Sequence, residues 1–402
     1  MKPKFYRKVL KNGLTVLFEK RDIPVVSVAF AVRCGGINES ENEKGISHFI
    51  EHLLYKGTPR RNAKQIAEEI EKNGGELNGF TDEEITAYWC KMPSRHIDVA
   101  LDVLSDMVKN PLFDEKEIEK EREVIFEEIK MRKDTPRIYV YDSIQECLYE
   151  KPLGIPAIGN YNSVNSINKK KILERFQKTY TPDNMILCVV GDADFEKIIN
   201  FAEKNFSKEK GKVSNFRIKL RNKKKAEKRK GIDQANLIFA YHVPLFSNKK
   251  YSAAQVLNTL MATGMSSRLF SEIREKRNLA YAIRGDSVIS RNFAFNVIYV
   301  GTTKENIEEV KKIILKEFED VTRTLSEKEL NQIKEQIIGN YHISLEDSQL
   351  QMTNLLSYEI NGDSREFYNF EKNISKVKVK DVKELAKKAM KNYSLFALIP
   401  ED

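Results

Sequence analysis

Near the N-terminus the chain reads Gly45-Ile-Ser-His-Phe-Ile-Glu-His52, and these eight residues carry its strongest signal. His48 and His52 are four residues apart, so on a helix they project from nearly the same face, one turn apart. Two imidazoles at that separation can reach one zinc ion. Glu51 lies beside the pair, where a carboxylate can accept a proton from metal-bound water. The order H-x-x-E-H is the inverse of the zinc motif H-E-x-x-H.

A catalytic zinc site needs a third protein ligand, and the sequence offers candidates about 70 residues later. Residues 121–128 read EREVIFEE, within a predicted helix from Asp114, its N-cap candidate, to Arg132. Spacing alone does not choose among the four glutamates of this run, which are Glu121, Glu123, Glu127 and Glu128. For most of them the ordinary interpretation is a solvated acidic face of the helix.

The elements expected around this motif are short strands and amphipathic helices. A strand-like run starts at Ile23, and two more, GELNGF and EITAYWCKM, follow Gly74 with a polar turn between them. Apolar periodicity predicts helices from Ala63 to the Gly74-Gly75 stop and from His96 to Val108. Strands followed by runs of helices are typical of the α+β class.

The two halves of the chain resemble each other at an offset of about 210 residues. The strand-like run from Ile23 parallels the run from Ile232, and the apolar strand after Asn184 parallels the one after Tyr393. Helix-like patterns open at Gly45 in the first half and at Gly264 in the second. The sequence therefore predicts two homologous α+β domains, each a mixed, mostly antiparallel sheet with helices packed on one face.

The net charge of +9 over 402 residues comes from one segment. Residues 208–230 hold twelve Lys or Arg and two Glu, a net charge of +10, so the rest of the chain carries −1. We interpret residues 207–224 as a basic linker between a zinc-binding catalytic domain, 1–206, and a second homologous domain, 225–402. A nucleic-acid partner is not expected, because Phe216 is the only aromatic residue in the basic segment.

Cysteine usage and hydropathy point to a cytoplasmic protein. The four cysteines lie far apart and form no C-x-x-C pair, which suits a reducing compartment. The N-terminal residues contain no apolar run typical of a signal peptide, and no stretch approaches the roughly 18 apolar residues of a spanning helix. We therefore expect no membrane partner.

The motifs together resemble those of the pitrilysin/insulinase zinc peptidases. The matching stretches are HFIEHLLYKGT from His48, EREVIFEEI from Glu121, YTPDNMILCVVGD from Tyr180 and GMSSRLFSEIREKRNLAY from Gly264. The resemblance covers nearly the whole chain and is strongest to short-chain bacterial members similar to the mitochondrial processing peptidase. It implies that Glu128 is the third zinc ligand and that Glu121 supports the ligands from behind.

The resemblance also implies an activity. It predicts a Zn²⁺-dependent endopeptidase that hydrolyses peptides bound in extended form inside a chamber, with Glu51 activating the zinc-bound water. Arg274 and Tyr281, seven residues apart in the second half, match an Arg/Tyr pair that reaches the zinc site in the family. A tyrosine hydroxyl can donate to the oxyanion at the attacked carbonyl, and an arginine can hold a peptide carbonyl or chain terminus.

Two positions depart from the family pattern. Gly79 stands where the family often has Ala, in a strand that by resemblance pairs with the substrate. Asn78 is the other candidate substrate contact in that strand, although a turn Asn beside a Gly is nearly as good an interpretation. Asn278 stands where the family usually has Gly. The Gly79 departure affects the expected subsite preference, and both departures leave the expected chemistry unchanged.

An alternative function is a non-catalytic partner or structural subunit of a hetero-oligomer similar to the processing peptidase. Such relatives typically lack part of the zinc motif or the Arg/Tyr pair, whereas this chain has both. The expected partners are therefore a peptide or unfolded protein substrate and a second copy of the chain, with a heterodimer as the alternative.

Overall fold

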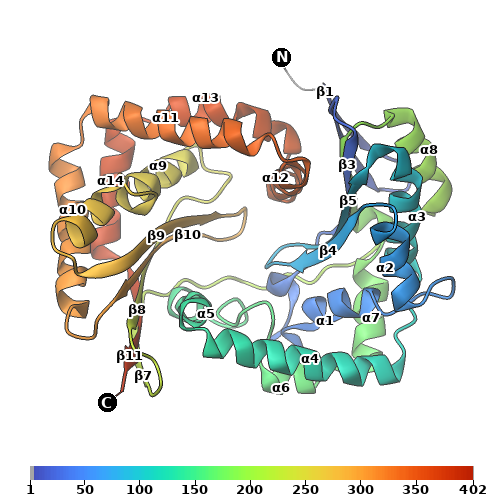
Figure 1. The fold of residues 1–402 in the computed structure, drawn as a ribbon, viewed down its shortest axis with the longest axis horizontal. Coiled ribbons are helices and arrows are strands. Elements are labelled where there is room, and N and C mark those ends of the chain that lie inside the picture. The colour runs from blue at the N-terminus through green and yellow to red at the C-terminus, as the bar shows by residue number, and fades with distance from the viewer. Residues whose placement is uncertain (1–3, 402) are drawn as a thin grey trace. The chain divides into compact units, whose positions relative to one another are not determined.

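The computed structural model describes residues 4–401, which form two compact units (Figure 1). Each unit combines segments that are distant in the sequence. The first contains residues 4–130, 155–217 and 344–367, and the second contains residues 131–154, 218–343 and 368–401. The two units group residues by their contacts in space and do not test boundaries along the chain. The predicted domain bounds, with a linker at 207–224, therefore stay a prediction.

In the described part of the chain, the first unit contains a six-stranded mixed sheet with the order β1-β2-β6-β3-β5-β4. Only β2 and β6 run parallel. β3 and β6 lie in the middle and are buried along nearly their whole length, which explains their continuous apolar sequences. The strands are β1 (Lys4–Val9), β2 (Thr15–Lys20), β3 (Val25–Val32), β4 (Glu76–Thr81), β5 (Thr86–Pro93) and β6 (Met185–Gly191).

The main helical layer of this unit covers one face of the sheet. α3 packs on β3 and β5, and α1 packs on β4 and β5. The helices are α1 (Ile46–Leu54), α2 (Ala63–Glu71), α3 (Ile97–Lys109), α4 (Glu115–Asp134, in this unit as far as residue 130), α6 (Tyr161–Asn165), α7 (Lys169–Thr179) and α8 (Phe195–Asn205). Short 3-10 helices lie at Gly36–Asn38, Glu41–Glu43, Ser94–His96, Pro182–Asn184 and Ser364–Asn369.

One helix from far along the chain, α12 (Ser348–Asn361), covers the other face at β3 and β6. Polar contacts fix it there: Ser348 Oγ lies 2.9 Å from Ser27 Oγ, and buried Glu359 accepts hydrogen bonds from Arg7 and Arg33 at 2.8 Å. Because side chains alternate along a strand, Ser27 faces α12 while Val28 faces the main core.

The second unit repeats the same strand arrangement with one strand fewer. Its order is β7-β11-β8-β10-β9, and only β7 and β11 run parallel. The strands are β7 (Lys224–Arg229), β8 (Ala235–His242), β9 (Ala280–Ile289), β10 (Ala294–Thr302) and β11 (Ser394–Pro400). The order matches β2-β6-β3-β5-β4 strand for strand, including the parallel pair. This match supports the two homologous copies that the sequence predicts.

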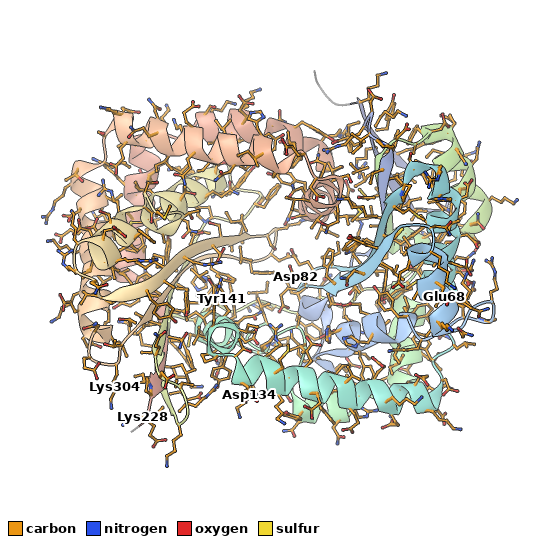
Figure 2. All side chains as sticks on the ribbon, viewed as in Figure 1. Glu68, Asp82, Asp134, Tyr141, Lys228 and Lys304 are labelled. Atoms are coloured by element: carbon orange, nitrogen blue, oxygen red, sulfur yellow. The ribbon has the colours of Figure 1, made fainter. Side chains whose placement is uncertain are left out.

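Helices also cover both faces of the second sheet. α9 packs on β9 and β10, α14 packs on α9 and α10, and α5 packs on β8 and β11. Tyr141, labelled on α5 in Figure 2, donates a hydrogen bond of 2.7 Å to Asp286 of β9. The helices are α5 (Pro136–Leu148), α9 (Tyr251–Ala262), α10 (Ile307–Thr324), α11 (Glu327–Ser344), α13 (Phe370–Ser375) and α14 (Val379–Lys391), with a π-helix at Phe270–Glu275.

The predicted fold class is confirmed, and the elements expected around the motif lie where the sequence places them. The pattern opening at Gly264 forms the π-helix rather than an ordinary α-helix. The sequence predicted helices on one face of each sheet. In the structure α12 also covers the other face of the first sheet, and α5 also covers the other face of the second. Within residues 4–401, no helix is both long and apolar enough to cross a membrane.

Candidate metal centre

Helix α1 presents its two histidines on its less buried side. Its apolar residues, such as Phe49 and Leu53, are fully buried against the sheet, whereas the His48 and His52 side chains are 13% and 21% exposed. The buried Glu39 carboxylate accepts the backbone N–H groups of Gly45 and Ser47 at 2.8 and 2.7 Å. A carboxylate at this position accepts hydrogen bonds from N–H groups at the helix start, and its negative charge interacts favourably with the positive end of the helix dipole. Glu39 therefore fixes where α1 begins.

The third member of the cluster comes from α4. The Nε2 atoms of His48 and His52 each lie 3.6 Å from the same oxygen, Oε2 of Glu128. One ligand atom from each of the three residues lies within 4.8 Å of the others. Among the four glutamates that spacing left open, geometry therefore selects Glu128, while Glu123 and Glu127 are exposed.

These three side chains fit a zinc ion. Two imidazole nitrogens and a carboxylate oxygen are ligand types that zinc prefers, and three protein ligands leave one position open for water. Ligand atoms about 2.1 Å from a tetrahedral ion lie about 3.4 Å apart, close to the 3.6 Å between each histidine Nε2 and Glu128 Oε2. All three residues belong to the first compact unit.

Glu121 supports the cluster from the same helix. Its Oε2 lies 3.1 Å from Nδ1 of His52, and its Oε1 lies 2.6 Å from Nζ of Lys56. Burial opposes the ionisation of Glu121, but the hydrogen bonds from His52 and Lys56 outweigh it and lower its pKa. An ionised Glu121 holds the proton of His52 on Nδ1 and leaves the Nε2 lone pair for a metal.

Glu51 faces strand β4 from α1. Thr81 donates a hydrogen bond of 2.7 Å from its hydroxyl to Glu51 Oε2. Burial raises the pKa of Glu51, while the hydrogen bond from Thr81 and the proximity of His52 lower it, and burial wins. A carboxylate with a raised pKa is a better proton acceptor near neutral pH.

The two candidate substrate contacts lie on β4, next to Glu51. β4 is an edge strand, and within residues 4–401 only β5 pairs with it. Figure 2 labels Asp82, in the turn that joins the two strands. Asn78 is exposed, and its Oδ1 accepts the backbone N–H of Gly79 at 2.8 Å.

Arg274 and Tyr281 belong to the second unit, so their approach to the metal ligands stays a prediction. Arg274 is exposed at the end of the π-helix, with its guanidinium 5.0 Å from the ring centre of Phe270. Asn278 lies between the two residues with a φ of +52°. That left-handed conformation favours Gly and tolerates Asn, which explains this departure from the family pattern.

The ring of Tyr281 lies against Gly301 of β10. A Cβ atom added at Gly301 would overlap the Tyr281 ring. The Tyr281 hydroxyl lies 3.4 Å from the hydroxyl of Tyr299, which donates a hydrogen bond of 2.7 Å to Asn236 Oδ1. Tyr299 uses its proton on Asn236, so it offers Tyr281 an acceptor and holds it in place.

Sequence reasoning missed the residues that hold the candidate site in place. The sequence places Thr81 in a polar turn and Lys56 inside the stretch HFIEHLLYKGT, but it gives neither residue a role at the site. Tyr299 and Gly301 belong to no quoted motif. Contacts between distant segments, such as Thr81 with Glu51, leave no periodicity in the sequence. An isolated Gly inside a strand pattern, as at Gly301, indicates that another group packs closely against the strand backbone. This is the one sequence signal that points to the contact with Tyr281.

Comparison with protein families matches both halves of the chain. Residues 15–160 match the model described as insulinase (peptidase family M16), and residues 166–337 match the model described as the peptidase M16 inactive domain. The first match contains the metal cluster and Glu51. The second contains Arg274 and Tyr281. The word inactive belongs to the description of this second match, and His48, His52, Glu51 and Glu128 lie outside it.

Similar proteins carry related names. An uncharacterized zinc protease of Rickettsia felis is 35% identical over 344 residues, covering 85% of this chain and 84% of that protein. The uncharacterized zinc protease YmxG of Bacillus subtilis is 31% identical, with 86% of each chain covered.

Solved structures share the fold over essentially the full length. A protease from Helicobacter pylori is 24% identical with a TM-score of 0.91, covering 99% of this chain and 100% of that one. A chain of complex III2 from Candida albicans is 17% identical with a TM-score of 0.86, covering 98% and 95%. One fold thus occurs both in a protease and in a chain of a larger complex.

Proposed function

Because the chain belongs to the pitrilysin/insulinase (M16) family of peptidases, we propose that it is a zinc-dependent endopeptidase acting on extended peptides. The observation that carries this proposal is the convergence of His48, His52 and Glu128 beside Glu51. The names of the relatives as zinc proteases support the choice of metal.

Each residue of the cluster has a distinct role in this proposal. His48, His52 and Glu128 hold the ion through Nε2, Nε2 and a carboxylate oxygen, and Glu121 keeps the His52 ring in the metal-binding tautomer. When bound, Zn²⁺ lowers the pKa of a water molecule and polarises the scissile carbonyl.

Glu51 is the general base. Thr81 holds Oε2, which fixes the carboxylate plane while Oε1 accepts the proton of the attacking water. Glu51 then delivers that proton to the nitrogen of the leaving amine as the peptide C–N bond breaks. The raised pKa of Glu51 suits both steps, because the group must accept and then release a proton.

The substrate lies along the edge of β4 as an added strand, where backbone hydrogen bonds bind a peptide without regard to its sequence. Asn78 and Gly79 contact it. Arg274 and Tyr281 complete the site. Tyr281 gives up its long hydrogen bond to Tyr299 and donates the same proton to the oxyanion, and Arg274 holds a carbonyl or terminus.

The rival function is a non-catalytic partner subunit, as the likeness to a chain of complex III2 illustrates. The presence of the metal cluster, Glu51, Arg274 and Tyr281 in one chain favours the enzyme. The same completeness is compatible with a homodimer, which we propose, whereas split residue sets would require two different chains. Light scattering on the purified chain tests it: twice the 46.6 kDa monomer mass is expected, and a stable monomer would contradict it.

We place the enzyme in the cytoplasm, in line with four buried, unpaired cysteines that suit a reducing compartment.

The activity is tested by digesting a peptide library with the purified chain and analysing the products by mass spectrometry. Cleavage should stop after treatment with a chelator and return with added zinc. Cleavage that is insensitive to chelation, or none by a chain with one zinc bound, would overturn the proposal.

A further inference from the structure

Three tyrosines of the core lie near Glu51: Tyr88 is fully buried, whereas Tyr55 and Tyr180 are partly buried. The hydroxyls of two of them satisfy each other. The Tyr88 and Tyr180 hydroxyls lie 2.6 Å apart and form a hydrogen bond, and the Tyr88 ring packs 6.0 Å from the ring of Tyr55. Tyr88 and Tyr180 therefore have a structural role in the core. Tyr55 differs, because its buried hydroxyl has no hydrogen-bond partner among the described residues.

An unsatisfied buried hydroxyl is costly, so its surroundings indicate its use. Tyr55 follows Glu51 by four residues and thus lies on the same side of α1. A Cβ atom added at Gly79 would overlap the Tyr55 hydroxyl and would lie 3.1 Å from Glu51 Oε1. The Tyr55 hydroxyl and Glu51 Oε1 therefore border the same spot beside β4.

This arrangement explains the second departure from the family pattern. The resemblance places Ala at position 79, and here the hydroxyl of Tyr55 takes the space of that methyl group. Gly79 has no positive φ that would require a glycine. The close approach of Tyr55, with the carbonyl oxygen of Ala87 2.9 Å from the same point, is what excludes a side chain.

We propose that Tyr55 is a positioning residue for Glu51, and that Gly79 is needed to make room for it. The Tyr55 hydroxyl donates to Glu51 Oε1 as the substrate-loaded site tightens, while Thr81 holds Oε2. The carboxylate is thereby held in one orientation toward the attacking water. This inference rests on the proposed peptidase function and adds to it a residue pair, Tyr55 with Gly79.

The first test is Tyr55→Phe, which removes only the hydroxyl. We expect kcat to fall about tenfold, the effect of one hydrogen bond to a charged group, with KM and zinc content unchanged. Tyr6→Phe is the matched control, because Tyr6 is 41% exposed on β1. A kcat for Tyr55→Phe equal to that of the control would overturn the positioning role.

The second test is a double-mutant cycle with Gly79→Ala. The added methyl overlaps the tyrosine hydroxyl and displaces it from its place beside Glu51, so Gly79→Ala alone should lower kcat by up to about a hundredfold and should also lower Tm. The double variant Tyr55→Phe/Gly79→Ala should regain most of the lost Tm and show the kcat of Tyr55→Phe, because the overlap with the Tyr55 hydroxyl is gone and the contact with the Ala87 carbonyl oxygen remains. Additive effects of the two substitutions on Tm and kcat would refute the pairing.

Failure of the proposed peptidase function and failure of the role of Tyr55 give different experimental results. Absence of peptide cleavage by the zinc-loaded wild type would overturn the proposed function, and this inference with it. Full wild-type activity together with full activity of Tyr55→Phe would overturn only the inference. The Tm cycle needs no activity and tests the steric pairing by itself.

Discussion

Nδ1 of His52 lies 3.1 Å from Oε2 of Glu121, on the ring edge away from Glu128. A buried carboxylate in this position orients the imidazole and makes its other nitrogen a stronger ligand. Burial lowers the pKa of His52, but the hydrogen bonds to Glu121 and Glu128 outweigh it and raise the pKa to about 9. The ion must therefore displace a proton when it binds.

Glu121→Gln should weaken zinc binding about 10- to 100-fold without abolishing it. The amide removes the charge that orients His52, and all three ligands remain. A competition titration with a fluorescent chelator measures the affinity, and Glu123→Gln, at an exposed position on the same helix, is the control. Equal affinities for the two variants would remove the supporting role of Glu121.

Glu128→Gln should lower zinc content well below one ion per chain, because a neutral amide is a much poorer zinc ligand than a carboxylate. Glu127→Gln is the matched control, since Glu127 is the adjacent residue and its side chain is 77% exposed. Elemental analysis after dialysis gives the result. A Glu128→Gln protein that retains full zinc affinity would exclude Glu128 as the third ligand.

Gly301→Ala should reproduce the loss of Tyr281. The new methyl group displaces the Tyr281 ring, so kcat should fall at least about tenfold toward the level of Tyr281→Phe, while zinc content stays at wild type. Gly339→Ala serves as control, because it lies in α11 with no atom within 4 Å of the added Cβ. Unchanged kcat in Gly301→Ala would contradict the role of Tyr281.

Acid should destabilise the first unit through Glu359. Burial alone raises the pKa of this group, but the hydrogen bonds from Arg7 and Arg33 outweigh it and lower the pKa below its usual 4.5. A lowered folded-state pKa contributes stability that is complete above about pH 4.5 and is lost as the pH falls through the folded-state value.

Glu359→Gln should therefore cost about 2 kcal/mol in the free energy of unfolding at pH 7, and the cost should shrink as the pH falls below about 4.5. Urea unfolding at several pH values measures it. Glu346→Gln, at an exposed position just before α12, is the control. The same cost at pH 3 as at pH 7 would show that ionisation of Glu359 does not hold α12 to the sheet.

Much of the fold could be predicted because local patterns carry it. Apolar periodicity indicated α2, α3 and α4, and Asp114 indeed caps α4 by accepting the Lys116 N–H at 2.8 Å. The duplication predicted two similar sheets. The packing of α12 on the first sheet could not be predicted, because it depends on contacts over long sequence separations, such as Arg33 with Glu359.

The candidate site was predictable to the level of residue type. The His48/His52 spacing needs only helical periodicity, whereas the choice of Glu128 among four glutamates depends on how α4 is rotated against α1. That rotation is set by tertiary packing. The resemblance pointed to Glu128, and in the structure its Oε2 lies 3.6 Å from Nε2 of both histidines.

The central claim is that Glu51 carries out proton transfer at a zinc site built by other residues. Its most direct test compares peptide hydrolysis and zinc content in wild type and Glu51→Gln. We predict about one zinc per chain in both proteins, with hydrolysis in the wild type and at least about a thousandfold less in the variant. A zinc-loaded Glu51→Gln protein that cleaves peptides at the wild-type rate would contradict the account.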